Sequence, residues 1–465
     1  MAELLTLITS KPNWQTKIND PKILKKWLAE FSQQNINPVV LDLVISLLKQ
    51  ADQVKNTTFN DDESYDWVLQ LSVDPKQISL CDCECKCKIC QGRELEEDYP
   101  DSDYSDYSGS STASDVSDVS DVECKCTPDA LRKIRSKFMF DQVEIDFDLI
   151  DKKTKKKFMD VVKQFQDSID IDYHPGSNNQ VIDLIHPSMY SYIRGITQTA
   201  NPPAPDVLFQ WLPSEFKIKN GHTTILTYIN GLNPITNSEL YDSIENIFDR
   251  FIPKFEAVLH KQYATGRLNS KPPAQLSNCQ VIVKLADTVL TPQSTIFNGG
   301  SWHLEGLPNE KIIATGIYYY QMENISSNYL NFRTTMTDSV DIDYPQSCPQ
   351  YVSKHYGMTD DTATMSLGQI ETVEDMCLVF PNFMQHKVSE FSLENKRKSG
   401  SRKILVFFLI DPSTRILSTA DVNPQQELIS RSDAELYREL LMFERKYEMT
   451  NQSTFYERGW SLCEH

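Results

Sequence analysis

The chain of 465 residues contains no long apolar run. A helix needs roughly 20 consecutive apolar residues to cross a bilayer, and no segment approaches that length. The beginning of the sequence also lacks the charged start, apolar middle and small-residue cleavage site of a secretory signal. We therefore expect an intracellular protein, cytoplasmic or nuclear, with no membrane partner.

Positive charge is also scarce. The sequence has 46 Lys and Arg against 65 Asp and Glu, which gives a formal net charge of -19. Residues 94–123 contain eleven acids and no Lys or Arg, so this segment contributes -11 and the rest of the chain -8. Because no basic stripe is available to contact a phosphate backbone, nucleic acid is an unlikely partner.

Cysteine is concentrated in one low-complexity segment, residues 76–127. This Cys-rich and acidic segment has too little apolar sequence to offset the entropy of ordering it, so we expect a disordered insertion. Soft thiolates favour Zn(II) or Cu(I), and a flexible thiol-rich segment without metal is the alternative reading. The candidate thiolates are Cys81, Cys83, Cys85, Cys87, Cys90, Cys124 and Cys126. We expect the other four, Cys279, Cys348, Cys377 and Cys463, to be free thiols.

Hydrophobic periodicity predicts helices first and strands later. Two helices are expected within residues 20–52, and further helices at Lys152–Ser168, Asn237–Leu259 and Ser432–Glu448. After Leu259, β-branched and aromatic runs separated by Gly, Pro, Asn and Ser predict strands. These are Cys279–Leu285, Lys311–Gln321, Met376–Phe380, Val388–Leu393 and Lys403–Ile410. The pattern indicates an α+β protein whose core is a double-stranded β-helix, that is, a jelly roll, wrapped by helices.

The same pattern suggests five regions along the chain. We expect an N-terminal helical region, the disordered insertion, a supporting helical and loop region, the double-stranded β-helix core, and a C-terminal helix with a tail. Their expected boundaries are 1–75, 76–127, 128–260, 261–430 and 431–465.

The principal candidate site begins at Trp302-His303-Leu304-Glu305-Gly306. Side chains alternate along an extended strand, so His303 and Glu305 point the same way and can hold one cation together. His386, which ends the segment Phe380–His386, supplies a third ligand if the fold brings its strand alongside. Two imidazoles and one carboxylate form the facial triad of non-haem Fe(II) oxygenases, which leaves three coordination positions open. The competing interpretation is chance, because a lone His-x-Glu is common.

Arg402, which follows His386 in the sequence, could bind an anionic cosubstrate. Arg402 begins an apolar run that reads as a buried strand, and its guanidinium could pair with a carboxylate in two parallel hydrogen bonds. Lys396, Arg397 and Lys398 are rivals, but they adjoin Ser399-Gly400-Ser401 and read as an exposed turn.

These motifs resemble the 2-oxoglutarate-dependent oxygenases. In that superfamily an Arg or Lys on the core strand after the distal His holds the far carboxylate of 2-oxoglutarate, and the resemblance assigns this role to Arg402. Glu305 stands where the superfamily more often has Asp. Much of the chain, about residues 1–75 and 130–430, also resembles an uncharacterised, mainly fungal family of unknown function (DUF 4246), itself similar to these oxygenases. The matching blocks are Ile8–Trp14, His174–Ser188, Tyr228–Pro234, Pro308–Tyr320 and Ser418–Gln426.

Other residues are weaker candidates. Alternation along Tyr318-Tyr319-Tyr320 should turn at least one phenol into the cavity, and we take Tyr318, Tyr320 and Arg333 as further cosubstrate contacts. His174 and His186 have Pro and Gly neighbours typical of turns, so we expect them to be structural or substrate-loop residues rather than ligands.

The sequence therefore predicts an Fe(II)/2-oxoglutarate-dependent dioxygenase that hydroxylates or demethylates a small molecule or a protein side chain. His303, Glu305 and His386 would hold the iron. Two alternatives remain open. A cupin-like metalloenzyme would use the same triad without needing Arg402, and a non-catalytic metal-binding or interaction protein would release no succinate. Neither the substrate nor the oligomeric state is specified by these motifs.

Overall fold

The computed structural model describes residues 8–9, 11, 13–32, 38–56, 137–268, 271–335, 362 and 364–457. The Cys-rich insertion, Cys348 and Cys463 lie outside these ranges. The chain divides into two compact units, which are 1–71, 140–332 and 369–455 in the first and 72–139, 333–368 and 456–465 in the second. In the described ranges, no helix has both the length and the apolar character needed to cross a membrane.

The described N-terminal residues include helices α2 (Trp14–Ile18), α3 (Pro21–Ser32) and α4 (Pro38–Asn56). The carboxylate of Asp20 caps α3 by accepting the amides of Lys22 and Ile23, and proline occupies the first position of both α3 and α4. The two helices predicted within 20–52 are thus confirmed. Arg194 ties α4 to the rest of its unit through Asp42 Oδ2 and Ser46 Oγ, each at 2.9 Å.

A large antiparallel sheet forms one wall of the first unit. Its order is β1-β12-β9-β15-β7-β5-β6, and β2 also pairs with β7. The strands span Glu144–Asp146 (β1), Val181–Ile185 (β2), Ser214–Lys219 (β5), His222–Ile225 (β6), Asn278–Leu290 (β7), Ile312–Glu323 (β9), Cys377–Pro381 (β12) and Gly400–Ile410 (β15). Four of these strands, β1, β2, β5 and β6, come from the interval 128–260, for which the sequence indicated only helices and loops.

A smaller sheet faces the central strands of the large one. It has the order β11-β10-β13, and a bridge between His303 and His386 extends it. Its strands span Thr364–Thr372 (β11), Asn328–Thr335 (β10) and Gln385–Val388 (β13). The described residues also form two short strand pairs, which are β8 (Ile296–Phe297) with β14 (Phe391–Ser392) and β3 (Tyr192–Ile193) with β4 (Phe209–Gln210). The strand expected at Val388–Leu393 is instead divided between β13 and β14.

The chain crosses repeatedly between the two sheets. From β7 it passes through β8 and His303, returns to β9, crosses to β10 and β11, returns to β12, crosses to β13 and β14, and ends in β15. Successive parts of the chain thus alternate between the two sheets, and neighbouring strands within the large sheet are antiparallel. This arrangement is a double-stranded β-helix, and together with the helices it makes the protein α+β.

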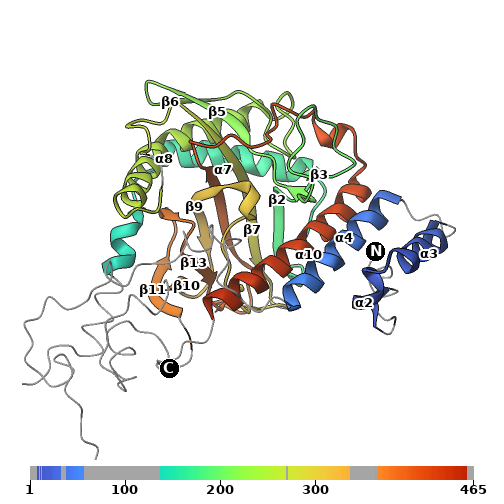
Figure 1. Cartoon of the computed structure of the whole chain (residues 1–465). Helices are drawn as coiled ribbons and strands as arrows, with labels where there is room; N and C mark the ends of the chain where they lie inside the picture. The colour runs from blue at the N-terminus through green and yellow to red at the C-terminus, as the bar shows by residue number, and fades with distance from the viewer. Residues whose placement is uncertain are drawn as a thin grey trace, which may run out of the picture. The chain divides into compact units, whose positions relative to one another are not determined.

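Helices α7 (Lys152–Ser168) and α8 (Ser238–Ala264) cover one face of the large sheet (Figure 1). Phe248 and Phe251 of α8 pack edge-on against Phe407 of β15, at centroid distances of 5.1 and 5.5 Å. Gly316 of β9 permits this approach, because a Cβ there would lie 2.8–2.9 Å from Phe255 and Phe251. The helix-covered face is therefore filled with apolar side chains, which leaves the opposite face, toward the small sheet, to carry polar chemistry.

Three predicted helices are confirmed. α7 has the bounds expected, and the carboxylate of Asp151 caps it by accepting the amides of Lys153 and Thr154 at 3.0 Å. α8 continues beyond Leu259 to Ala264, and the C-terminal helix, α10 (Arg431–Tyr456), is longer at both ends than the pattern indicated. Cys279 and Cys377 are buried free thiols, as predicted.

Candidate functional site

The three predicted ligands converge although they come from distant parts of the chain. Antiparallel bridging sets His303 beside His386, since each amide donates to the other's carbonyl at 3.0–3.1 Å. Glu305 Oε1 lies 3.3 Å from His386 Nε2 and 3.7 Å from His303 Nε2. One ligand atom from each residue lies within 4.8 Å of the other two. The site is therefore compact enough for one cation.

Both imidazoles have the proton arrangement that a metal requires. Nδ1 of His303 lies 2.8 Å from the Ser301 carbonyl, and Nδ1 of His386 lies 3.5 Å from the Met384 carbonyl. A carbonyl only accepts, so an N–H on each Nδ1 satisfies it and leaves Nε2, on the Glu305 side, as the nitrogen that can coordinate a metal. Metal-binding histidines are oriented by this kind of contact.

Electrostatics keep the carboxylate charged. Burial alone would raise the pKa of Glu305, but hydrogen bonds and charge from His303 and His386 hold it well below the usual range. Burial likewise opposes the charged form of His303, yet its bond to Glu305 raises its pKa, whereas burial and the neighbouring His303 lower that of His386. The site thus presents an ionised acid between two imidazoles. It is more open on one side, because the side chain of His303 is 30 % exposed and that of His386 is 4 % exposed.

Asn382 positions Glu305 through its backbone. The Asn382 side chain accepts the Glu305 amide and donates to the Glu305 carbonyl, both at 2.9 Å, and it donates to the Ile312 carbonyl at 3.0 Å. Asn382 lies within the segment Phe380–His386 that drew attention to His386, but no local pattern indicated that its side chain would bind the backbone of Glu305. Fixing the peptide units on both sides of the Glu305 Cα orients its side chain.

The loop after Glu305 is held by a buried acid. Glu310 accepts the amides of Leu307 and Trp211 at 2.7 and 2.6 Å and also pairs with Arg445 of α10. Gly306 has a φ of 75°, and a Cβ there would lie 2.6 Å from the Ile312 side chain. Glycine is therefore needed directly after the acidic ligand, because the turn leaves no room for a side chain.

Arg402 lies on the face of β15 opposite the helices. Alternation puts Leu405 and Phe407 against α8, and hence Arg402 and Phe408 on the other face. Phe380 occupies the same sheet face and contacts the His386 ring at 4.8 Å. Arg402 and the three converging ligands therefore open onto the same interior.

The Arg402 guanidinium is buried, and no acid among the described residues pairs with it. It is 5 % exposed and lies 4.9 Å from the centre of the Tyr319 ring. Its Nε finds no hydrogen-bond partner among the described residues. Burial lowers its pKa, with Tyr319 opposing the shift. Lys396, Arg397 and Lys398 are exposed in the turn before β15, as their neighbours indicated.

The predicted cosubstrate contacts Tyr318 and Tyr320 need correction. Both point toward the helices: the Tyr320 hydroxyl donates to Asp287 at 3.0 Å, its ring meets Phe158 at 5.1 Å, and the Tyr318 hydroxyl lies 3.5 Å from Asp375. Alternation that places these two on one face places Tyr319 on the other, so Tyr319 is the phenol that reaches Arg402.

Arg333 is also not available to a cosubstrate. In the second unit its guanidinium pairs with Glu457 at 2.7 Å and lies 6.0 Å from the centre of the Tyr456 ring. A carboxylate of the chain thus already occupies the position that an anionic ligand would take. Arg333 was a candidate because a guanidinium can bind an anionic group, and the sequence alone does not show that Glu457 pairs with it.

A cavity of about 330 Å³ adjoins the acidic ligand. Glu305 and Asn382 form part of its wall, and Arg267 and Lys311 contribute positive charge. The Arg267 guanidinium stacks 4.0 Å from the Phe383 ring. The cavity therefore offers a binding space with both charged and polar walls next to Glu305.

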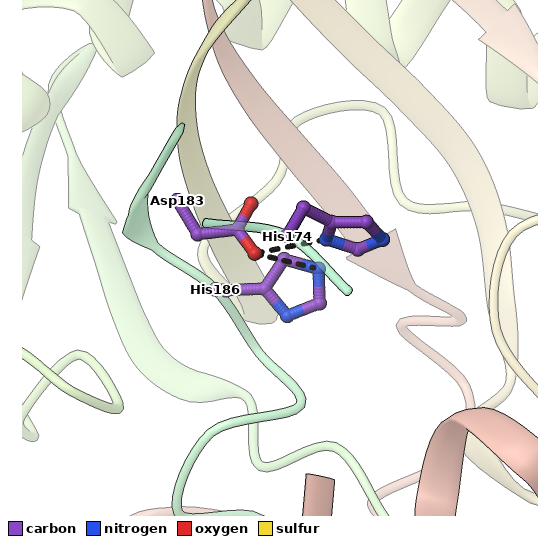
Figure 2. Close-up of side chains that lie close together, drawn as sticks. All are labelled: His174, Asp183 and His186. Carbon is purple, nitrogen blue, oxygen red and sulfur yellow. Dashed lines mark hydrogen bonds and ion pairs between the residues drawn. The ribbon is translucent and has the colours of Figure 1, made fainter. Parts of the chain in front are cut away.

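The structure assembles a second cluster of similar composition that the sequence interpretation set aside. His174, Asp183 and His186 each place a ligand atom within 4.8 Å of the others (Figure 2). The surrounding Pro and Gly residues led us to expect loop roles only. The missed signal is Asp183, which lies between the two histidines in a predicted turn region but belongs to strand β2.

Comparison with known proteins gives one family match. The model of a family described as "protein of unknown function (DUF4246)" matches residues 141–278 and 268–433. Comparison with curated protein sequences gives no match.

Several solved structures are similar to this chain at low sequence identity. They include an Fe(II)/α-ketoglutarate-dependent dioxygenase, TqaL (13 % identity, TM-score 0.31, 61 % of this chain and 88 % of that one). An oxidoreductase of the 2OG-Fe(II) oxygenase family from Burkholderia pseudomallei is another (7 %, TM-score 0.28, 63 % and 94 %). A third is a dioxygenase for auxin oxidation from rice (11 %, TM-score 0.29, 72 % and 93 %).

Proposed function

We propose that this chain, which belongs to the DUF4246 family of proteins of unknown function, is a non-haem Fe(II)/2-oxoglutarate-dependent oxygenase. The observation that carries the proposal is the convergence of His303, Glu305 and His386, with both Nε2 atoms facing one ionised carboxylate. The double-stranded β-helix adds support, and so does the buried guanidinium of Arg402, which pairs with no acid among the described residues.

The ligand set fits iron. Two imidazoles and one carboxylate occupy three positions of an octahedral ion and leave three for other ligands, as oxygenase chemistry requires. Bound Fe(II) would supply the activation of dioxygen, with 2-oxoglutarate as the co-reductant that leaves as succinate and carbon dioxide. The chain's own contribution is to hold the ligands, through the carbonyls behind the two imidazoles and through Asn382 behind Glu305.

Arg402 fits the far carboxylate of 2-oxoglutarate. A buried cation without a counter-ion is costly, and a dicarboxylate that enters the barrel would satisfy it with two charge-assisted hydrogen bonds. Tyr319, on whose ring the guanidinium lies, would restrict its position. The cavity bounded by Glu305, Arg267 and Lys311 is the proposed approach for the substrate, a small molecule or a protein side chain that is hydroxylated or demethylated.

The proposal is tested by succinate formation. Purified protein with Fe(II), 2-oxoglutarate and oxygen should release succinate slowly even without substrate, and His303→Ala should abolish the release. His222→Ala is the matched control, because that side chain is 84 % exposed and lies on β6. Equal rates in the wild type and His303→Ala would reject catalysis at this site.

A binding measurement separates the proposal from a metalloenzyme that does not use 2-oxoglutarate. Under anaerobic conditions, calorimetry should show 2-oxoglutarate binding that requires both Fe(II) and Arg402. If Arg402→Met binds 2-oxoglutarate as tightly as the wild type, the cosubstrate assignment is wrong, whatever the fate of the metal site.

A further inference from the structure

We propose that His174, Asp183 and His186 form a second divalent-metal site, independent of the one built on His303. No motif of a known finger or enzyme marks it, and its chemistry follows from three side chains and their surroundings.

Local backbone pairing gathers the cluster. His174 precedes β2, Asp183 lies within β2 and His186 follows it. The bridge between Tyr173 and Ile182, with the His174 amide bonded to the Val181 carbonyl at 2.9 Å, folds the approach strand back on β2. This antiparallel return places His174 beside Asp183, and the short step after β2 brings His186 to the same side.

Pairing of β2 with β7 fixes the direction of the Asp183 side chain. Asp183 pairs with Ala286 of β7, whereas Val283 and Leu285 of β7 belong to the helix-covered core. Asp183 therefore points to the barrel side of the large sheet. There the His186 ring meets Trp211 edge-on at 6.4 Å, and Trp211 stacks on Phe408. The cluster thus rests on rigid elements rather than on a solvent-exposed loop.

Both imidazoles turn toward one carboxylate (Figure 2). Asp183 Oδ2 lies 2.8 Å from His174 Nδ1 and 4.0 Å from His186 Nε2. The side chains of Asp183 and His186 are 1 % and 5 % exposed, so only His174, at 26 %, opens the site outward. Two nitrogens and one oxygen at this spacing suit Zn²⁺ or Fe²⁺, with a position left on the His174 side for water or another ligand.

An unsatisfied oxygen strengthens the case. Asp183 Oδ1 is buried and has no hydrogen-bond partner among the described residues. Buried carboxylate oxygens are normally paired, and one left over calls for a missing donor, water or ion. The hydrogen bond from His174 compensates only one oxygen of the Asp183 carboxylate. A cation held between the three side chains would compensate the remaining negative charge.

Three features oppose binding and set its strength. The Ser188 amide donates to His186 Nδ1 at 3.1 Å, so without metal the His186 proton lies on Nε2 and must move for Nε2 to coordinate. The positive charge of Lys284 also acts on Asp183 and His186. Coordination through His174 Nδ1 likewise displaces the proton that it donates to Asp183 Oδ2 at 2.8 Å. Three ligand bonds outweigh these two lost hydrogen bonds, but the losses weaken affinity about 10- to 100-fold relative to a site without the conflict. We therefore expect a weaker site than the one at His303.

The test uses Zn²⁺ and the full chain. The double variant His303→Ala/His386→Ala removes the first site, and alkylation near pH 7.5 blocks accessible thiols. Buried Cys279, whose pKa burial raises to about 12, should stay unmodified. This protein should bind one Zn²⁺ through nitrogen and oxygen, with no sulfur in its X-ray absorption spectrum. Absence of that equivalent would overturn the proposal, without any bearing on catalysis at His303.

Matched variants in the same background assign the ligands. Asp183→Asn should weaken Zn²⁺ binding at least 100-fold, whereas Asp170→Asn, at an exposed position nearby, should leave it unchanged. Because loss of a buried carboxylate could impair folding, His174→Gln, at a half-buried position, is the second variant, with near-UV circular dichroism as the check on folding. Full affinity in a folded His174→Gln protein would overturn the site as drawn.

Discussion

The two His/acid/His clusters have the same composition and the same compactness, yet they differ in how their imidazoles are held. At His303 and His386, backbone carbonyls lie behind the rings, so each Nε2 faces Glu305 and can bind a metal while the hydrogen stays on Nδ1. At His186, a backbone amide lies behind the ring, so the proton sits on the nitrogen that faces Asp183. The types of ligand residue therefore do not distinguish the two sites. The backbone group that bonds Nδ1, the ring nitrogen turned away from the acid, distinguishes His303 and His386 from His186.

They also differ in assembly. The first site joins segments some 80 residues apart through a strand bridge, as the contact of Glu305 with Asn382, 77 residues away, illustrates. The second lies within one stretch, 174–186, folded back on itself. A site built across two sheets is preorganised by the whole barrel, whereas one built on an edge strand depends on that strand's pairing with β7.

The largest effect is expected from Glu305→Gln, which removes the only acid of the first site. Fe(II) affinity there should fall more than 100-fold, because losing even an outer partner of a ligand costs about 10- to 100-fold. Competition with a chromophoric chelator measures it, and Glu390→Gln, at an exposed position close to His386, is the control. Zn²⁺ binding at Asp183 should not change. Parallel loss at both clusters would show that they are not independent.

Arg402→Met should separate cosubstrate binding from metal binding. Loss of two charge-assisted hydrogen bonds, each worth about 1.5–3 kcal/mol, should weaken 2-oxoglutarate at least 100-fold and leave both clusters able to bind metal. Without 2-oxoglutarate the variant should be as stable as the wild type or more stable, by up to about 4 kcal/mol, because an unpaired buried charge is removed. Urea unfolding measures this, with exposed Arg397→Met as control. A destabilised variant would indicate a structural role.

Asn382→Ala tests the outer support of the first site alone. Three hydrogen bonds to the backbone around Glu305 and Ile312 would be lost, and Fe(II) affinity should fall about 10- to 100-fold. Asn309→Ala is the control, because Asn309 in the same loop makes only a 3.5 Å contact with the Phe209 carbonyl. Unchanged iron affinity in Asn382→Ala would mean that the strand bridge alone positions Glu305.

The smallest effect expected is a difference in pH dependence between the clusters in chelator-treated protein. The pKa of His303 is raised, so its stabilisation is present below about pH 6.5 and is lost as pH rises through the folded pKa. Burial lowers the pKa of His186 well below the ordinary value, so its unfolded form takes up the proton first and stability falls as pH drops below about 6.5.

Single glutamine variants should therefore flatten opposite limbs of the stability profile. His303→Gln should reduce the slope above pH 6.5 and His186→Gln the slope below it, each by at most about 1.4 kcal/mol per pH unit. Urea unfolding between pH 5 and 8.5 measures both, with exposed His222→Gln as the reference. If both variants changed the slope of stability on the same side of pH 6.5, the opposite pKa shifts of His303 and His186 would be contradicted.

Much of the fold was accessible from local pattern. Amphipathic spacing and capping predicted α3, α4, α7, α8 and α10, and apolar runs predicted β7, β9, β12 and β15, because these signals are carried within each element. Strands β1, β2, β5 and β6 were missed, and so were β10 and β11 of the small sheet. The pairing of β1 with β12, and of β2 and β5 with β7, joins segments remote in sequence, whereas β6 pairs with its neighbour β5.

The candidate site shows the same division. Alternation in an extended segment set His303 and Glu305 on one face, and an apolar run marked Arg402 as buried. Local pattern left open which tyrosine faces the barrel, and we expected Tyr318 and Tyr320. Packing of α7 and α8 against one side of the sheet decides it, and Tyr319 remains on the other side.

By itself, the sequence determined the long helices, the long strands of the core and which side chains of each share a face, since periodicity is a property of the local backbone. Only the tertiary structure decided that His386 meets His303, that Asn382 holds Glu305, and that His174, Asp183 and His186 share a carboxylate oxygen. The reason is physical: hydrogen bonds between strands join residues at any separation along the chain, and the partner behind each ring nitrogen exists only after the strands have paired.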